Sequence, residues 1–232
     1  MAKIDPIRRA EIGREKRART RAQLVAAASA LFARQAVESV TVDDVIGEAG
    51  VAKGTFYVHF QDLDALIAAV ADELVRSIDD LLQPVRLSID DPALRIAYGC
   101  SCFIDKALSD PGWAGLAARM GMTAAKGGEV ARRRLHQDLT LLAKRLPQGG
   151  VSAELSLEIV VGIQLQVLGA IAGGRLSSRH REGAIAAILR AIGLDARQVK
   201  SMIARLPVRA DAARSDQSGK GAKPRPRRAA RG

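Results

Sequence analysis

The sequence predicts an all-α protein with a small N-terminal helix-turn-helix head and a larger helical body. Apolar residues make up 48% of the 232 residues, while aromatic residues make up only 3%, and no strand-like spacing of turns is present. Apolar residues recur at helical spacing along most of the chain. Many of these segments begin at a capping residue and end at glycine or proline.

Basic residues are concentrated at the two ends of the chain. Residues 1–21 carry eight Lys or Arg against three acids, and residues 209–232 carry eight against two. The residues between them carry equal numbers of positive and negative side chains. Basic arms bind polyanions, which are either nucleic acid or an anionic membrane surface. For the C-terminal arm, a solubilising tail without a partner is the alternative.

In the head, residues 1–19 form the expected basic N-terminal arm, and residues 20–66 form the helix-turn-helix domain. The first helix is predicted to begin at a capping box, Thr20-x-x-Gln23. A second box, Thr41-x-x-Asp44, begins a short helix that ends at Gly50. Residues 53–60 are long enough for only two helical turns. The next helix is expected to begin at Asp62 and to stop at Pro84.

Residues 67–208 form the predicted body. Helices are expected near 91–108, 110–122, 128–146, 152–175 and 178–192, with a last short helix that begins at Asp195 and ends at Pro207. Residues 209–232 are rich in Ser, Gly, Pro and Arg and lack an apolar period. We expect them to form a disordered basic tail.

The segment from Thr41 to Phe60, TVDDVIGEAGVAKGTFYVHF, has the pattern of a helix-turn-helix. Ala49 provides a small contact between the helices, Gly50 the turn, and Val51 an apolar residue that fills the gap. Phe56 and Phe60 lie one turn apart and form a buried edge. The outward residues are then Lys53, Thr55, Tyr57 and Val58, with His59 at the rim.

This segment closely resembles the TetR family of bacterial transcription regulators, whose pattern reads T-x-x-x-I-A-x-x-A-G-V-S-x-G-T-x-Y-x-H-F. The chain matches it at Thr41, Val45, Ala49-Gly50-Val51, Gly54-Thr55, Tyr57 and His59-Phe60. The resemblance covers about residues 20–66. The remainder agrees in being helical, in its length, and in ending with two long apolar helices.

The resemblance implies a DNA-binding repressor and gives roles to single residues. Lys53, Gly54 and Thr55 are expected to form the base-reading edge, and Val58 to touch a thymine methyl group. Thr41 is expected to bind a phosphate at a helix N-terminus. For Lys53, the alternative is a merely solvated lysine.

Four further residues are expected to contact the DNA backbone or the minor groove. Tyr57 and His59 are expected to bind phosphates and so to fix the register, although partial burial against the first helix is the alternative. Arg19 and Arg21 lie just outside the predicted first helix, where they can reach a minor groove.

The chain departs from the family pattern at three positions. Ala52 stands where the family usually has serine, and Ile46 replaces a common alanine. Leu63 stands where a phosphate-binding lysine is frequent, and it lies between Asp62 and Asp64. These acids oppose the DNA backbone, so we expect the N-terminal arm to supply the missing attraction.

The last two apolar helices are predicted to form a homodimer through a four-helix interface. Packing within one chain is the alternative. A homodimer would place two heads on a near-palindromic operator. The residues expected in this interface are Gly162, Gln166, Gly169, Gly173, Ile185, Ile188 and Leu189.

A mostly aliphatic effector pocket is expected between the head and this interface. Its ligand would be apolar or acyl-like and would release the repressor from DNA. Core packing alone is the alternative for each lining residue. The pocket is expected to be lined by some of Phe103, Trp113, Met120, Met122, Gln164 and Leu168.

The sequence contains no predicted catalytic residue, metal site or cofactor site, because no catalytic-triad, metal-ligand or phosphate-loop spacing is present. Cys100 and Cys102 point to different sides of one helix and are expected to be buried free thiols, as in a reducing cytoplasm. The N-terminus has no secretory signal, and residues 159–172 are too short to span a membrane. The alternative function is sequence-neutral binding of nucleic acid or a membrane by the basic arms.

Overall fold

The computed structural model describes residues 6–123, 129–146 and 151–206, and within these ranges every regular element is a helix. The all-α prediction is therefore confirmed. The elements are α1 (Pro6–Arg34), η1 (Val37–Ser39), α2 (Val42–Ala49), α3 (Lys53–His59), α4 (Leu63–Arg86), α5 (Pro92–Ser109), α6 (Pro111–Thr123), α7 (Glu129–Ala143), α8 (Ala153–Ala172), η2 (Ser178–His180), α9 (Arg181–Ala191) and α10 (Ala196–Ala204). The predicted basic tail, 209–232, lies outside the described residues.

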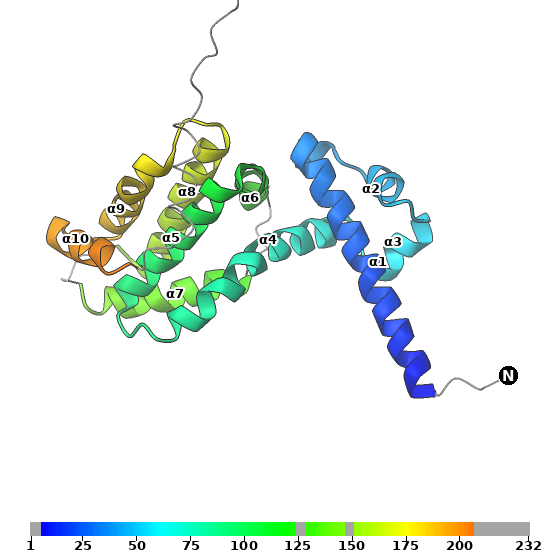
Figure 1. The fold of residues 1–232 in the computed structure, drawn as a ribbon, viewed down its shortest axis with the longest axis horizontal. Coiled ribbons are helices and arrows are strands. Elements are labelled where there is room, and N and C mark those ends of the chain that lie inside the picture. Colours follow the sequence, from blue (N-terminus) through cyan, green and yellow to red (C-terminus); the bar gives the residue numbers. More distant parts are fainter. Residues whose placement is uncertain (1–5, 124–128, 147–150, 207–232) are drawn as a thin grey trace, which may run out of the picture.

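The helices form two packed regions that α4 connects (Figure 1). The head contains α1, α2, α3 and the first part of α4, which enclose one hydrophobic core. The body contains α5 to α10 and the second part of α4, which enclose another. The apolar residues that recur at helical spacing supply the buried side chains of these two cores.

The helix α1 begins much earlier than predicted. It starts at Pro6, and Thr20 lies inside it, where its hydroxyl donates a hydrogen bond to the carbonyl oxygen of Lys16. Gln23 donates its side-chain amide to the carbonyl oxygen of Ala49, 2.6 Å away. The predicted capping box is therefore wrong. The segment before Thr20 is rich in Arg, Lys, Glu and Ala, which favour helix, so the basic arm is a helical extension from residue 6 onward.

The other predicted helix starts in the head and body are confirmed at the residues that cap them. Thr41 and Asp44 form a reciprocal capping box, and Asp62 accepts a hydrogen bond from the backbone amide of Ala65. Ser152 caps α8 and Asp195 caps α10 in the same way. Each of these side chains satisfies a backbone donor that the first helical turn leaves free.

Two helix ends show opposite outcomes. Gly50 has a φ of 65°, the left-handed conformation that ends α2 as predicted. Pro84 does not end α4, which continues to Arg86. Pro84 lies in the last turn of α4, and its missing amide removes only one hydrogen bond of the helix, so the helix can continue for two more residues.

Helix α6 belongs to both cores. Leu116 and Met120 are buried in the hydrophobic core of the head. On its other side, Gly115 and Ala118 lie against α8, with a methyl group built at Gly115 only 3.4 Å from the Cβ of Ala172. Arg119 also donates a hydrogen bond to the carbonyl oxygen of Ala33 at the end of α1. The head and the body are therefore packed together through α6 as well as joined through α4.

Candidate DNA-binding surface and effector cavity

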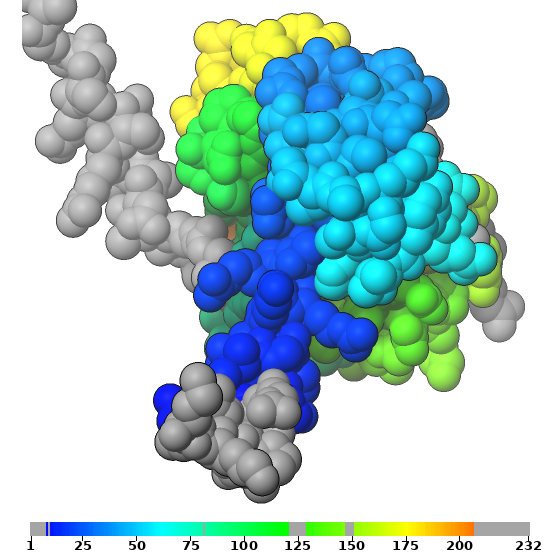
Figure 2. Space-filling model, turned by 90° about the vertical axis from the view of Figure 1, so that its right-hand side faces the viewer, coloured from blue at the N-terminus to red at the C-terminus, as the bar shows by residue number. Residues whose placement is uncertain are grey.

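Helix α3 is held by its two phenylalanines and presents its other side to solvent. Phe56 is fully buried and Phe60 is nearly so, with ring centroids 5.9 Å apart. Tyr57 and Val58 are 53% and 64% exposed. Figure 2 views the molecule from the side of the head, with α2 and α3 in lighter blue and the start of α1 projecting below them in dark blue. Tyr57 and Val58, on the predicted outward face of α3, are thus open to solvent.

Lys53, at the start of this face, is paired rather than free. Its Nζ lies 2.9 Å from Oδ1 of Asp43 on α2, and both side chains are largely exposed. The hydrogen bond to Asp43 raises the pKa of Lys53, so this amine stays charged at neutral pH. Lys53 is therefore not a merely solvated lysine, because it forms an ion pair with a carboxylate of the preceding helix.

Gly54 lies next to Lys53 on the same exposed face. A methyl group built at this position meets no protein atom within 4 Å. Packing within the head therefore does not require glycine here, and its lack of a side chain leaves room for close approach from outside. Ala52 gives α3 no side-chain cap, as expected from the replaced serine.

The hydroxyl of Thr41 is engaged within the protein. It donates a hydrogen bond to Oδ2 of Asp44 at 2.7 Å and accepts one from the backbone amide of Asp44. The hydrogen bonds from Thr41 lower the pKa of Asp44, so this carboxylate is ionised at neutral pH. Asp43 and Asp44 thus place two negative charges at the helix end where a phosphate contact is predicted.

The remaining predicted DNA-binding residues lie on α3 and α1. Thr55 and His59 are half-buried, while Arg19 and Arg21 are exposed on α1. The guanidinium of Arg21 lies 5.1 Å from the ring centroid of Phe60, which holds it beside the end of α3. This contact was not predicted, because it joins residues on different helices.

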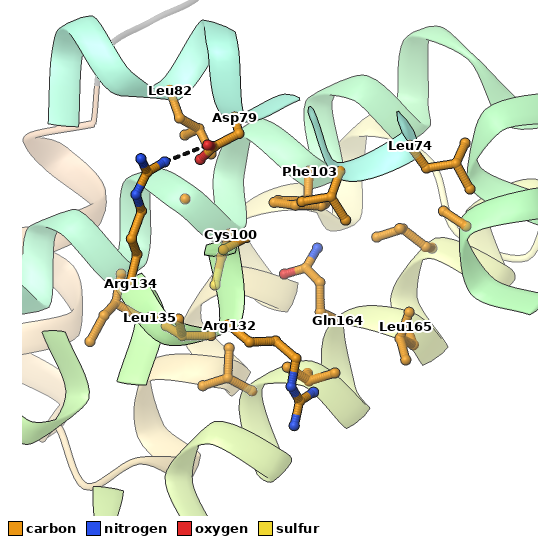
Figure 3. A pocket seen from close by; sticks show the side chains of 18 of the residues that line it. Leu74, Asp79, Leu82, Cys100, Phe103, Arg132, Arg134, Leu135, Gln164 and Leu165 are labelled. Atoms are coloured by element: carbon orange, nitrogen blue, oxygen red, sulfur yellow. Dashed lines mark hydrogen bonds and ion pairs between the residues drawn. The ribbon is translucent and has the colours of Figure 1, made fainter. Parts of the chain in front are cut away.

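The body contains a cavity of about 500 Å³ lined by α4, α5, α6, α7 and α8 (Figure 3). Five of the predicted pocket residues line it. Met122 lies near the end of α6, among residues whose side chains the structure does not describe. The five are Phe103, Trp113, Met120, Gln164 and Leu168.

Gln164 is the unusual residue of this cavity. It is only 8% exposed, and neither its amide oxygen nor its amide nitrogen has a hydrogen-bond partner among the described residues. The indole nitrogen of Trp113, which also lines the cavity, is likewise buried and has no hydrogen-bond partner among the described residues. In Figure 3 the amide of Gln164 extends into the space beside Phe103 and Cys100.

A charged side of the cavity was missed by the sequence predictions. Asp79 pairs with Arg134, and Asp138 accepts hydrogen bonds at 2.8 Å from both Arg86 and Arg95. These residues come from α4, α5 and α7, so no single stretch of sequence indicates their meeting. Their ion pairs fix the three helices relative to one another, because a buried charge is strongly destabilising without its partner.

The two cysteines are buried free thiols, as predicted. Cys100 lines the cavity, and burial raises the pKa of its thiol to about 12. A thiol with so high a pKa is protonated at neutral pH and is a poor nucleophile. Cys100 therefore acts as part of the apolar wall.

The predicted dimer face is only partly available on the surface. Ile185, Ile188 and Leu189 are fully buried in the body's own core, because α9 turns its apolar side toward α5 and α8. Gly169 faces α6, where an added methyl group would lie 3.5 Å from Ala118. The three apolar residues of α9 therefore pack within one chain, which is the alternative that the sequence left open, while Gly169 is half-buried and its place in a dimer interface stays a prediction. The predicted residues that are exposed are Gly162, Gln166 and Gly173.

Helix α8 is long and apolar enough, by length and composition alone, to cross a membrane. The helix is longer than the apolar stretch 159–172 to which the sequence expectation referred, because it extends from Ala153 to Ala172. Such a helix is weak support for a membrane span, since core helices of helical bundles have the same composition. Only 28% of its apolar window is buried within the chain.

Comparison with known proteins identifies relatives of both regions. Residues 24–70 match the family model described as bacterial regulatory proteins, tetR family. RolR in complex with resorcinol is 28% identical, with a TM-score of 0.55, and the match covers 84% of this chain and 98% of RolR. RolR without ligand is 26% identical, with the same TM-score of 0.55, over 81% of this chain and 98% of RolR.

A more distant structure shares the fold. The fatty acid degradation regulator FadR from Bacillus halodurans is 14% identical, with a TM-score of 0.56, over 84% of this chain and 100% of FadR. The likeness therefore extends over head and body together, beyond the segment that the family model matches.

Proposed function

We propose that this chain acts as a homodimeric repressor. It belongs to the tetR family of bacterial regulatory proteins and is a DNA-binding transcriptional regulator. In this proposal it binds a near-palindromic operator and leaves it when a small, mostly apolar effector occupies the body cavity. The observation that carries the proposal is α3, whose inner edge is buried through Phe56 while Tyr57 and Val58 remain exposed. A short helix of this kind presents side chains to a major groove.

The base-reading role is assigned to Lys53, Gly54, Thr55 and Val58. Lys53 would exchange Asp43 for a guanine or a phosphate, and Val58 would contact a thymine methyl group. The backbone contacts are assigned to Thr41, Tyr57 and His59. Arg19 and Arg21, with the rest of the basic extension of α1, would bind the neighbouring phosphates or the minor groove.

The surface proposed for dimerisation is the exposed side of α8. It bears Gly162, Gln166 and Gly173, and Leu155 on the same helix is 55% exposed. An apolar helix that is mostly unburied in one chain is suited to packing against its copy. The corresponding part of α9 has Gly183 and Ala187 exposed, which allow two helices to approach closely.

The effector role of the cavity is supported by its size, its walls and its neighbours. Its volume lies in the range of sites for small organic ligands. RolR, which binds resorcinol in its solved complex, supports a small organic effector for this chain also. Resorcinol itself is a first compound to test.

The cavity and the head share wall residues, which provides a route for coupling. Ala71, Leu74 and Met120 line the cavity and also pack in or against the core of the head. A ligand that displaces these side chains would change how α4 and α6 hold the head. If it favours a dimer with wrongly spaced heads, affinity for the operator falls by population shift.

Selection of bound duplexes from a random pool, followed by footprinting on the selected sequence, tests this proposal. The expected result is a near-palindrome whose half-sites are one helical turn or a multiple apart, protected at physiological salt. Equal affinity for selected and random duplexes, with steep loss in salt, would instead favour sequence-neutral binding by the basic arms.

A further inference from the structure

We propose that the amide of Gln164 is a polar anchor that selects an uncharged effector with a hydroxyl group on an apolar, aromatic body. This inference rests on the effector role proposed above and adds the chemical class of the ligand. It starts from three buried polar atoms on the cavity wall that have no partner within the described part of the chain: Oε1 and Nε2 of Gln164 and Nε1 of Trp113.

An unpartnered amide at this position opposes folding. Gln164 is more than nine-tenths buried, and its neighbours along the cavity include Cys100, Phe103 and Leu168. A buried donor or acceptor that loses water without gaining a protein partner destabilises the folded chain. Leucine would fill the same space without this cost. A partner supplied by a ligand explains why glutamine is used here.

The unpartnered atoms define which ligand group can satisfy them. Nε2 of Gln164 and Nε1 of Trp113 are donors and need acceptors, whereas Oε1 of Gln164 is an acceptor and needs a donor. A hydroxyl group offers one donor and two acceptor lone pairs. An ether or ketone offers no donor, and an ionised carboxylate offers only acceptors. The hydroxyl is therefore the simplest group that matches the amide of Gln164, because it can donate to Oε1 and accept from Nε2.

The charged side of the cavity indicates that the ligand carries no charge. The guanidinium groups of Arg134, Arg86 and Arg95 are already paired with Asp79 or Asp138. At the rim, Arg132 pairs with Glu158. An anionic ligand would have to take an arginine from its carboxylate, which would leave a poorly solvated acid. A cation would meet the same obstacle at the carboxylates.

The apolar residues of the cavity suit an aromatic or aliphatic body. The rings of Phe103 and Trp113 lie with centroids 6.2 Å apart, a spacing typical of aromatic contacts. Leu74, Leu165 and Leu168 also line the cavity. A substituted phenol combines such a body with an uncharged hydroxyl at neutral pH.

Three matched probes test the inference: 4-propylphenol, its methyl ether 4-propylanisole, and 4-propylbenzoate. Binding to the full chain without DNA is measured by calorimetry and by tryptophan fluorescence. Trp113 is the single tryptophan of the sequence, so the fluorescence reports from the cavity itself. We expect the phenol to bind roughly tenfold to a hundredfold more tightly than the ether, and the benzoate most weakly.

Two variants connect this selectivity to the amide. In Gln164→Leu, the phenol and the ether should bind within about threefold of each other, because the anchor is removed. The unfolding midpoint of this variant without ligand should equal or exceed that of the wild type. Gln137→Leu changes an exposed glutamine outside the cavity and should leave the selectivity unchanged.

Equal binding of phenol and ether to the wild type, tighter binding of the benzoate, or no binding of the phenol would each overturn the inference. Selectivity that survives in Gln164→Leu would overturn it also. Because these titrations contain no DNA, their failure is distinct from failure of the proposed function, which the duplex selection measures.

Discussion

The polar residues proposed to bind ligands differ between the head and the body in their burial and in their hydrogen-bond partners. In the head, most of the side chains assigned to DNA are exposed, and several already have partners within the protein, such as Lys53 with Asp43 and Thr41 with Asp44. In the body, Gln164 and the indole nitrogen of Trp113 are buried without partners among the described residues. A surface that binds a polyanion can exchange water and weak ion pairs at little cost, whereas a buried site must present unsatisfied groups to recognise its ligand.

The largest effect that would sharpen this comparison is expected at Phe56. In Phe56→Ala, the loss of a fully buried ring should lower the free energy of unfolding by about 3–5 kcal/mol. Denaturant titration measures it. The matched control, Val58→Ala, removes an exposed side chain two residues away and should change stability by less than about 0.5 kcal/mol while weakening operator binding. Equal destabilisation by both would contradict the assigned faces of α3.

Removal of residues 1–19 should have the next largest effect, and on DNA affinity alone. The deletion removes seven basic residues, together with the part of α1 from Pro6 to Arg19, but leaves the buried stripe that begins at Leu24. We expect operator affinity to fall roughly tenfold to a hundredfold, and the salt slope to flatten by about 0.9 for each phosphate that the shortened protein no longer neutralises. Binding titrations at several salt concentrations measure both. An unchanged affinity and slope would remove this extension from the interface.

Loss of the α2 cap should have a smaller effect, which appears in stability as well as in binding. Thr41→Ala removes the hydroxyl that accepts from the amide of Asp44 and should destabilise the head by about 1 kcal/mol. Thr41→Ser retains the hydroxyl and should stay close to the wild type in thermal unfolding.

The same cap also predicts a pH dependence. Because Thr41 lowers the pKa of Asp44 in the folded chain, the stabilisation is present above the ordinary pKa of Asp and is lost as pH falls through the lowered value. Thermal unfolding of the wild type should therefore lose this contribution in acid, and Thr41→Ala should lose less over the same range. A parallel pH response in both proteins would contradict it.

The smallest effect is expected for Asp43→Asn. This change releases Lys53 from its exposed ion pair, so DNA affinity should rise by a few-fold. Asp80→Asn makes the same charge change on an exposed part of α4 and serves as the control. If both variants raise affinity equally, the gain comes from net charge, and Lys53 has no special place at the interface.

The features predicted correctly from the sequence are those that a few neighbouring residues determine. Thr41 with Asp44 forms a cap within one helical turn, and Gly50 supplies a left-handed residue at the turn that follows. Phe56 and Phe60 lie one turn apart, so their shared burial follows from helical geometry. The start of α1 is different, because the extension before Thr20 is helical without any buried stripe to indicate it.

The features that were missed depend on which helices meet in space. Ile185, Ile188 and Leu189 are apolar at helical spacing, and this pattern is the same for a helix that packs in its own core and one that packs against a copy. The contact of Asp138 with Arg86 and Arg95 joins residues more than forty positions apart. Such pairings arise from the tertiary arrangement and have no local pattern.

Because α6 contributes residues to the cores of both the head and the body, neither region can be exchanged for that of another regulator without a matching α6. Leu116 and Met120 complete the core of the head although they lie well beyond residue 70 of the sequence. A fragment that ended at the family match would leave an apolar patch uncovered. A chimera that joins this head to another regulator's body would need matching side chains on the replacement for α6. Mutations at Met120 that change ligand preference would also alter the packing of the head. Ligand preference and the packing of the head are therefore coupled at this residue.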